Sequence, residues 1–265
     1  MAKLRIATAQ FPVAASIARN LRDMRRLIAQ AKEQRADVVH FSETCLGGYA
    51  GVEFKSWDRY DWSALKTADT DLLQLAKKMR IGLVYGTNHR VADDDVRNAL
   101  VYVSAEGKRV ARYDKRFCTG GDLKYYRSGR RFVTFAIKGF TCGLLICYDV
   151  RFPELYRGCK KRGVQVLFQS FYNARRQGAN IHTTIMRPSL QAHAATNYFY
   201  ISANNSSGYY QSWPSVFVLP NGEIKATCRQ HRAGFMINEI DDKDEFYDAS
   251  SAYRERAMAG VLYSE

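Results

Sequence analysis

Hydrophobic and polar positions along the chain follow two periods, one typical of helices and one typical of strands. The clearest helical period begins at Ser16, a suitable N-cap, and brings Ile17, Leu21, Met24 and Ile28 onto one face. Short β-branched or apolar runs, such as residues 37–42, lie between the helical segments. Such runs are typical of buried strands. The chain therefore alternates strand and helix from its first residues onward.

The same pattern can be followed to the end of the chain. Strands are predicted over residues 3–11, 37–42, 81–88, 96–104, 108–114, 132–137, 140–146, 164–169, 198–204, 214–219, 223–228 and 233–240. Helices are predicted over residues 16–34, 67–79, 153–162 and 180–196. Pro188 is expected to kink or split the last helix. Strand–helix alternation with added hairpins predicts an α/β layered fold.

The chain carries no Pro/Gly/Ser-rich linker and no internal repeat. We therefore expect one domain over residues 1–265. Residues 241–265 are polar and aromatic without a clear period. They are expected to form a tail that packs on the surface or serves as an arm for a partner subunit.

Composition and charge narrow the class of protein. The chain has 265 residues, of which 46% are hydrophobic and 25% charged, and these values exclude a disordered, collagen-like or fibrous chain. Its 40 Lys and Arg against 26 Asp and Glu give a formal net charge of +14. That balance suits nucleic acid, an anionic membrane surface or an acidic substrate. The basic residues form no run long enough for a nucleic-acid patch, so we expect a solvated basic surface.

The six cysteines form no Cys-x-x-Cys pair and no zinc spacing with histidine. The first residues lack the apolar core of a signal peptide, and no apolar run reaches the ~20 residues of a membrane span. We expect a cytoplasmic protein with free thiols, no metal and no membrane or nucleic-acid partner.

The segment GLLICYDVRFPELYR, residues 143–157, carries the most informative chemistry. A buried strand ends on Cys147, and Pro153 and Glu154 mark the start of the helix that follows. A thiol between a strand and a helix N-terminus lies beside free backbone N–H groups, which favour a thiolate and can hold an oxyanion. Cys147 is therefore the candidate nucleophile, although buried cysteines usually have only a packing role.

Two further segments place a reactive side chain at the end of a predicted strand. FSETCLGGY puts Glu43 after the strand over residues 37–42, and YDKRFCTGGD puts Lys115 at the end of the strand over 108–114. Either side chain, taken alone, is typical of a solvated loop residue. Ligand sites in α/β sheets form at the carboxyl ends of strands, so acid, amine and thiol are expected to converge in one pocket.

These three motifs, in this order, resemble those of the nitrilase superfamily of carbon–nitrogen hydrolases. The resemblance extends from the first strand to about Ile240 and implies a four-layer αββα sandwich. It implies that Cys147 attacks an amide carbonyl to form a thioester, that Glu43 is the general base, and that Lys115 and the backbone N–H of Tyr148 stabilise the oxyanion. It also implies a homodimer or larger homo-oligomer and no cofactor.

The sequence departs from that family's pattern at two places. Asp122, in GGDLKYYRSG, is found where many members carry a second glutamate. Its shorter side chain is expected to hold Lys115 or the substrate amine through a water, or to lie in a shifted loop. In QAHAATNYFY, His193 and Thr196 replace an Arg/Glu pair common in the family, which indicates a divergent branch.

The form CYDxRFPEL of the nucleophile motif resembles that of amidases that act on ω-amides of small carboxylic acids. Arg151 either binds a substrate carboxylate through a bidentate contact or forms an ion pair with Glu154 or another acid. Other candidate substrate-binding residues on nearby loops are Tyr49, Phe117, Phe171, Tyr172 and Asn173. The pair Arg175-Arg176 suits an anionic substrate, but a solvated loop is the simpler interpretation.

Alternative functions remain open from the sequence. Within the superfamily, the substrate is an N-carbamoyl amine or a nitrile. In another class of enzyme, Cys147 works with a histidine, namely His182, His193 or His231. In a third interpretation, the chain is a non-catalytic basic binding protein that binds polyanions in a salt-dependent manner.

Overall fold

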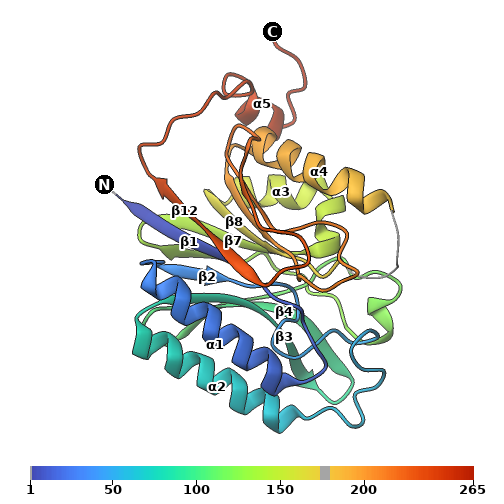
Figure 1. Cartoon of the computed structure of the whole chain (residues 1–265). Helices are drawn as coiled ribbons and strands as arrows, with labels where there is room; N and C mark the ends of the chain where they lie inside the picture. The colour runs from blue at the N-terminus through green and yellow to red at the C-terminus, as the bar shows by residue number, and fades with distance from the viewer. Residues whose placement is uncertain (1, 174–179) are drawn as a thin grey trace.

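Two six-stranded sheets pack face to face at the centre of the molecule (Figure 1). The computed structural model describes residues 2–173 and 180–265. The first sheet has the strand order β12-β1-β2-β3-β4-β5, with β1 (Lys3–Gln10), β2 (Val38–His40), β3 (Gly82–Ala92), β4 (Asp95–Val103), β5 (Arg109–Asp114) and β12 (Gly234–Asp241). The second has the order β11-β10-β9-β8-β7-β6, with β6 (Thr134–Ile137), β7 (Phe140–Ile146), β8 (Val166–Ser170), β9 (Tyr200–Asn204), β10 (Val216–Val218) and β11 (Ile224–Thr227).

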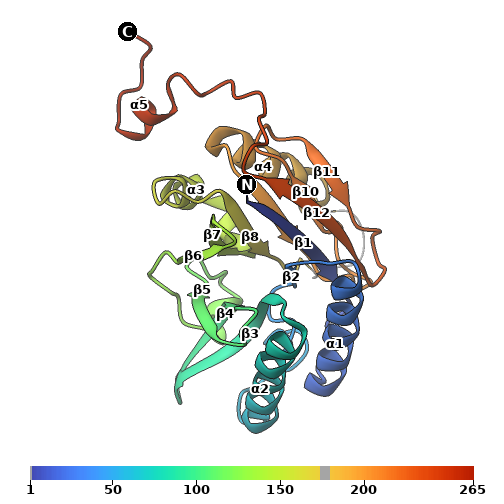
Figure 2. The ribbon, with the colours of Figure 1, turned by 90° about the vertical axis from the view of Figure 1, so that its left-hand side faces the viewer.

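Helices cover the outer face of each sheet (Figure 2). α1 (Ile17–Glu33) and α2 (Trp62–Met79) lie on the first sheet, and α3 (Pro153–Lys160) and α4 (Ile181–Asn197) lie on the second. Buried side chains of α1 and α2 join those of β2 and β3 in one apolar cluster. This burial fixes the helices to their sheet. The expected four-layer αββα sandwich is confirmed.

The structure differs from the sequence pattern at two helices. α2 begins at Trp62, five residues earlier than predicted, because the Asp61 side chain accepts the N–H of Ala64 at 2.8 Å and caps the helix there. α4 runs continuously through Pro188. Its buried face, with Met186 and Leu190 among its members, offsets the one backbone hydrogen bond that a proline removes.

Polar side chains join the two sheets across their interface. The His40 ring contacts Ser202 Oγ at 2.8 Å and Ser170 Oγ at 2.9 Å. Thr8 Oγ1 lies 2.8 Å from the same Ser202 oxygen. Burial lowers the pKa of His40 to about 3, so its ring is neutral at physiological pH. Hydrogen bonds are directional, so these contacts fix the lateral position of one sheet on the other.

The segment after β12 begins against the body of the protein. Arg254, in the short helix α5 (Arg254–Met258), is buried and donates to Asp248 at 2.7 Å and to the carbonyl of Thr196 at 3.0 Å. Farther along, Leu262 and Tyr263 are 82% and 69% exposed. No helix within residues 2–173 and 180–265 is long and apolar enough to cross a membrane.

Candidate active site

The three reactive side chains singled out from the sequence follow strand ends. Lys115 comes directly after β5, Cys147 directly after β7, and Glu43 three residues after β2. Glu43 and Lys115 therefore belong to the first sheet and Cys147 to the second. The backbone N–H of Glu43 donates to the carbonyl of Phe171, which follows β8, at 3.3 Å. This bond ties the strand ends of the two sheets together at the site.

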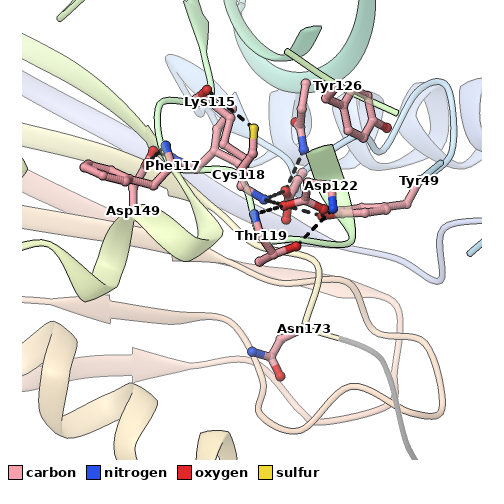
Figure 3. A network of polar contacts seen from close by, with 12 residues as sticks. Tyr49, Lys115, Phe117, Cys118, Thr119, Asp122, Tyr126, Asp149 and Asn173 are labelled. Atoms are coloured by element: carbon pink, nitrogen blue, oxygen red, sulfur yellow. Dashed lines mark hydrogen bonds and ion pairs between the residues drawn. The ribbon is translucent and has the colours of Figure 1, made fainter. Parts of the chain in front are cut away.

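Lys115 lies at the centre of a buried charge cluster (Figure 3). Its Nζ is 2.7 Å from Glu43 Oε1 and 2.9 Å from Asp122 Oδ2, and all three side chains are at most 1% exposed. Burial alone lowers the pKa of a lysine, but the neighbouring carboxylates outweigh it and raise the pKa of Lys115 well above its ordinary value. Lys115 therefore keeps its positive charge and is suited to stabilise an oxyanion.

Asp122 reaches Lys115 directly, which corrects the expectation of a bridging water or a shifted loop. Tyr49 donates its hydroxyl to Asp122 Oδ1 at 2.5 Å, and the backbone N–H of Thr119 donates to Oδ2 at 2.9 Å (Figure 3). Burial raises the pKa of this carboxyl, but Lys115 and these donors outweigh it and hold the pKa below its ordinary value. The short side chain is thus held ionised against the lysine, and Tyr49, predicted as a substrate contact, is bonded to it.

Glu43 presents one paired oxygen and one free oxygen. Its Oε1 accepts hydrogen bonds from Lys115 and from Asn98 Nδ2, each at 2.7 Å. Its Oε2 is buried and has no hydrogen-bond partner within the described part of the chain. Asn98 was missed by the sequence reasoning, although a polar amide inside the apolar strand VRNALVYV is a signal for it. A carboxylate held by one oxygen, with the other unpaired, is arranged to accept a proton.

Cys147 opens the turn between β7 and α3 in a strained backbone conformation, with a φ of 42°. Such a positive φ is uncommon outside glycine and is concentrated at functional sites. Burial and the charge of Glu43 raise the pKa of the thiol to about 12, against the lowering effects of Lys115 and the backbone N–H of Tyr172. The thiolate that the helix N-terminus favours is therefore opposed by burial and by Glu43. The thiol is neutral and needs a base.

A pocket of about 250 Å³ opens beside Cys147. It is lined by the predicted site residues Tyr148, Arg151, Tyr172 and Asn173, together with Thr119, Val150, His182 and Met186. His182 and Met186 lie one turn apart in α4. Met186 was not predicted from the sequence to line the pocket. Arg151 forms no ion pair with Glu154 or any other described carboxylate. The positive charge of Arg151 is therefore available to a ligand in this pocket.

Two other predicted contacts lie outside the residues that line this pocket. The Phe117 ring stacks on Phe152, with 3.5 Å between centroids, and Phe171 is fully buried against Trp213. His193 stacks on Tyr156, and His231 is exposed, so of the three candidate histidines only His182 lines the pocket. Arg175-Arg176 lies outside the described residues.

The described residues contain no group of three or more His, Cys, Asp or Glu side chains placed to hold a metal ion. The charged cluster around Lys115 already pairs its two carboxylates with an ammonium group. The arrangement consists of a neutral thiol, a carboxylate with a free oxygen and a fixed cation, which are the groups that nucleophilic acyl transfer requires.

Comparisons with known proteins agree with this arrangement. Residues 5–245 match the carbon–nitrogen hydrolase family. An ω-amidase of Xenopus tropicalis is 26% identical over 85% of this chain and 84% of its own length, and a chloroplastic ω-amidase of Arabidopsis thaliana is 24% identical over 99% and 74%. A variant of an amidase from Nesterenkonia AN1 has the same fold, with a TM-score of 0.84 at 21% identity over 98% of this chain and 96% of its own.

The family match spans all three strand-end motifs and both sheets. The chain therefore belongs to the carbon–nitrogen hydrolase family, within the nitrilase superfamily, and is a hydrolase of carbon–nitrogen bonds other than peptide bonds.

Proposed function

We propose that this protein hydrolyses the amide of a small ω-amide through a thioester on Cys147 and releases ammonia. The observation that carries the proposal is the buried, unpartnered Oε2 of Glu43, in a cluster that contains a charged Lys115 and adjoins a neutral Cys147 thiol. A neutral thiol needs a base that can take its proton during attack, and Glu43 has an oxygen free for that purpose.

The first half of the reaction forms the thioester. Cys147 Sγ attacks the amide carbonyl carbon as its proton passes to Glu43. Lys115 Nζ and the backbone N–H of Tyr148 stabilise the oxyanion that forms. The intermediate collapses, the carbon–nitrogen bond breaks, and the leaving nitrogen takes the proton from Glu43 and departs as ammonia. The raised pKa of Lys115 supports its role, because a donor to an oxyanion must hold its proton throughout.

The second half returns the enzyme to its starting state. A water attacks the thioester carbonyl and gives its proton to Glu43. The carbon–sulfur bond then breaks, the thiolate of Cys147 takes that proton, and the carboxylic acid leaves. In both halves Asn98 and Lys115 hold Oε1 of Glu43, so that Oε2 carries the moving proton. Asp122 serves as the auxiliary acid, because it holds Lys115 in place.

The pocket supports a substrate with a carboxylate at the end opposite the amide. Arg151 lines the pocket with no carboxylate partner among the described residues, and Val150 and Met186 supply apolar wall for a short carbon chain. Two relatives carry the name ω-amidase, and a variant of the Nesterenkonia amidase carries the acetamide moiety of fluoroacetamide covalently on its active-site cysteine. These likenesses favour an amide over a nitrile or an N-carbamoyl amine.

The experiment that tests the proposal compares carboxylate-bearing ω-amides with butyramide, nitriles and N-carbamoyl amines. We expect wild-type protein to release ammonia fastest from the ω-amides and to show a thioester on the Cys147 peptide by mass spectrometry. Cys147→Ala should remove both signals with the fold intact. Arg151→Ala should raise KM for ω-amides by about 10- to 100-fold, the effect of one lost hydrogen bond to a charged group, and leave butyramide unchanged.

Matched variants separate this proposal from a Cys–His hydrolase. His182 lines the same pocket, so His182→Ala is compared with Lys115→Ala. Retained turnover in Cys147→Ala contradicts the proposed nucleophile, and loss of turnover in His182→Ala with activity retained in Lys115→Ala supports the Cys–His alternative.

We also propose that the chain acts in the cytoplasm as one catalytic unit and assembles into a homodimer or larger homo-oligomer. Leu262 and Tyr263, exposed beyond α5, are the side chains that this proposal places against a partner subunit.

A further inference from the structure

Asp149 is a buried carboxylate that the proposed chemistry does not use. It lies two residues after Cys147 and is fully buried. Its Oδ2 accepts the Tyr113 hydroxyl at 2.7 Å and the backbone N–H of Ile146 at 2.9 Å. Its Oδ1 accepts the backbone N–H of Phe117 at 3.0 Å, and Figure 3 labels both Asp149 and Phe117. Three donors from three segments thus converge on one side chain.

Those donors lie close in sequence to Lys115 and to Cys147. Tyr113 and Phe117 lie two residues before and two residues after Lys115, and Ile146 directly precedes Cys147. Tyr113 belongs to β5 of the first sheet, whereas Ile146 ends β7 of the second. Asp149 therefore connects the strand and loop that carry Lys115 with the strained turn that carries Cys147. Charge-assisted hydrogen bonds of this kind are among the stronger ones in proteins.

We propose that Asp149 is a positioning residue: its ionised carboxylate holds the turn of Cys147 at a fixed place relative to Lys115, and its protonation releases that turn and lowers the rate. This inference rests on the proposed roles of Cys147 and Lys115, and it adds a pH-dependent element that those roles do not contain.

The hydrogen-bond pattern explains why protonation matters. An ionised carboxylate only accepts hydrogen bonds, and here all its partners are donors. A proton on Oδ1 faces the Phe117 N–H, and a proton on Oδ2 is accommodated only if the Tyr113 hydroxyl turns to accept it. In either case the remaining hydrogen bonds lose the strength that the carboxylate charge gives them. Burial raises the pKa of Asp149 to about 6, against the lowering effects of the Ile146, Tyr113 and Phe117 donors and of Lys115. The change therefore takes place in mildly acidic solution.

Lys115, two tyrosines and three thiols around Asp149 do not change charge in that range. Lys115 keeps its proton because its pKa is raised well above the ordinary value. Tyr113 and, from α3, Tyr156 have pKa values raised well above the ordinary value, chiefly by burial. The pKa values of nearby thiols are also raised by burial, that of Cys147 to about 12, that of Cys159 in α3 to about 12, and that of Cys118 above its ordinary value.

The test uses a pair of tyrosine variants. Tyr113→Phe removes one donor from the carboxylate and should raise the midpoint of the acid limb of kcat by roughly one pH unit, with KM unchanged. Tyr156→Phe is the matched control, because its hydroxyl is equally buried but donates to Gln169 at 2.5 Å. It should leave the acid limb where the wild-type protein has it. Asp149→Asn should lower kcat about 100-fold at neutral pH and lose this limb.

A second readout does not depend on the substrate. The rate at which iodoacetamide alkylates Cys147, followed on its peptide by mass spectrometry, should show a break at the same pH and the same shift in Tyr113→Phe. An unshifted break in Tyr113→Phe, or an equal shift in Tyr156→Phe, overturns the positioning role. If the wild-type protein hydrolyses no amide but the alkylation break shifts as stated, the proposed function fails and the positioning role of Asp149 stands.

Discussion

Replacing Lys115 with methionine removes the cation that contacts both Glu43 and Asp122 and keeps a side chain of similar length. The two contacts, at 2.7 and 2.9 Å, are each worth roughly 6 kcal/mol in Coulomb energy at an effective dielectric constant of ~20. Without the lysine, two carboxylates remain buried with no counter-charge, and the unfolded protein, in which both are hydrated, becomes more favourable.

Proton uptake limits the size of this loss. A carboxylate with an ordinary pKa near 4 can be neutralised at pH 7 for about 4 kcal/mol, which is less than the cost of leaving it charged and buried. We therefore expect Lys115→Met to lower the free energy of unfolding by about 3–5 kcal/mol at pH 7, the usual range for a broken buried pair. The native variant then binds a proton that its unfolded chain does not bind, so its deficit should shrink by about 1.4 kcal/mol for each pH unit of acidification.

Urea unfolding at a series of pH values measures this directly. Wild-type protein is compared with Lys115→Met and Asp122→Asn. Asp122→Asn keeps the ion pair of Lys115 and Glu43, whose net charge is zero. Asp122→Asn should lose only about 1.5–3 kcal/mol, the range for one hydrogen bond to a charged group, and should lack the pH slope. A loss in Lys115→Met that is below about 1 kcal/mol, or that does not change with pH, would refute the view that Lys115 neutralises two buried charges.

Two further predictions concern a residue of the cluster and the end of the chain. Asn98→Ala removes one of the two donors to Glu43 Oε1. It should lower kcat about 10- to 100-fold and the free energy of unfolding by about 1.5–3 kcal/mol. Unchanged values in an ω-amide assay and in urea unfolding would show that Lys115 alone holds Glu43. Replacing Leu262 and Tyr263 with serine should lower the mass of the assembly measured by light scattering. Serine at Leu123, an exposed side chain outside this segment, should leave that mass unchanged. Equal masses for the wild-type protein and the Leu262/Tyr263 variant would exclude these two residues from the assembly contact.

The fold and the main site could be predicted because both depend on local patterns. Alternating strands and helices indicate a layered fold. A side chain at the end of a strand is positioned by the sheet, so its place does not depend on the conformation of the loops. Glu43, Lys115 and Cys147 each have that position. The direct contact of Asp122 with Lys115 could not be predicted, because it depends on the Tyr49 hydroxyl and the Thr119 backbone, which approach only in three dimensions.

The missed features have physical causes of the same kind. Asn98 lies in the middle of β4, and only the folded sheet shows that its amide meets Glu43. The helix terminus beside Cys147 favours a thiolate, but burial and the charge of Glu43 raise the pKa of the thiol, two effects that a local sequence does not reveal. α2 starts early because Asp61 caps it, and the apolar period alone does not indicate which residue is the cap.

The contacts of His40 with Ser170 and Ser202 have a consequence for how this enzyme tolerates change. The proposed base and the proposed nucleophile are carried by different sheets, so a sideways slip between the sheets moves Glu43 away from Cys147 even when each sheet stays intact. Apolar contact alone resists separation but not sliding. In a lineage of such enzymes, exposed positions of the outer helices can vary, whereas a polar pair between the sheets can be exchanged only for another that keeps the same offset.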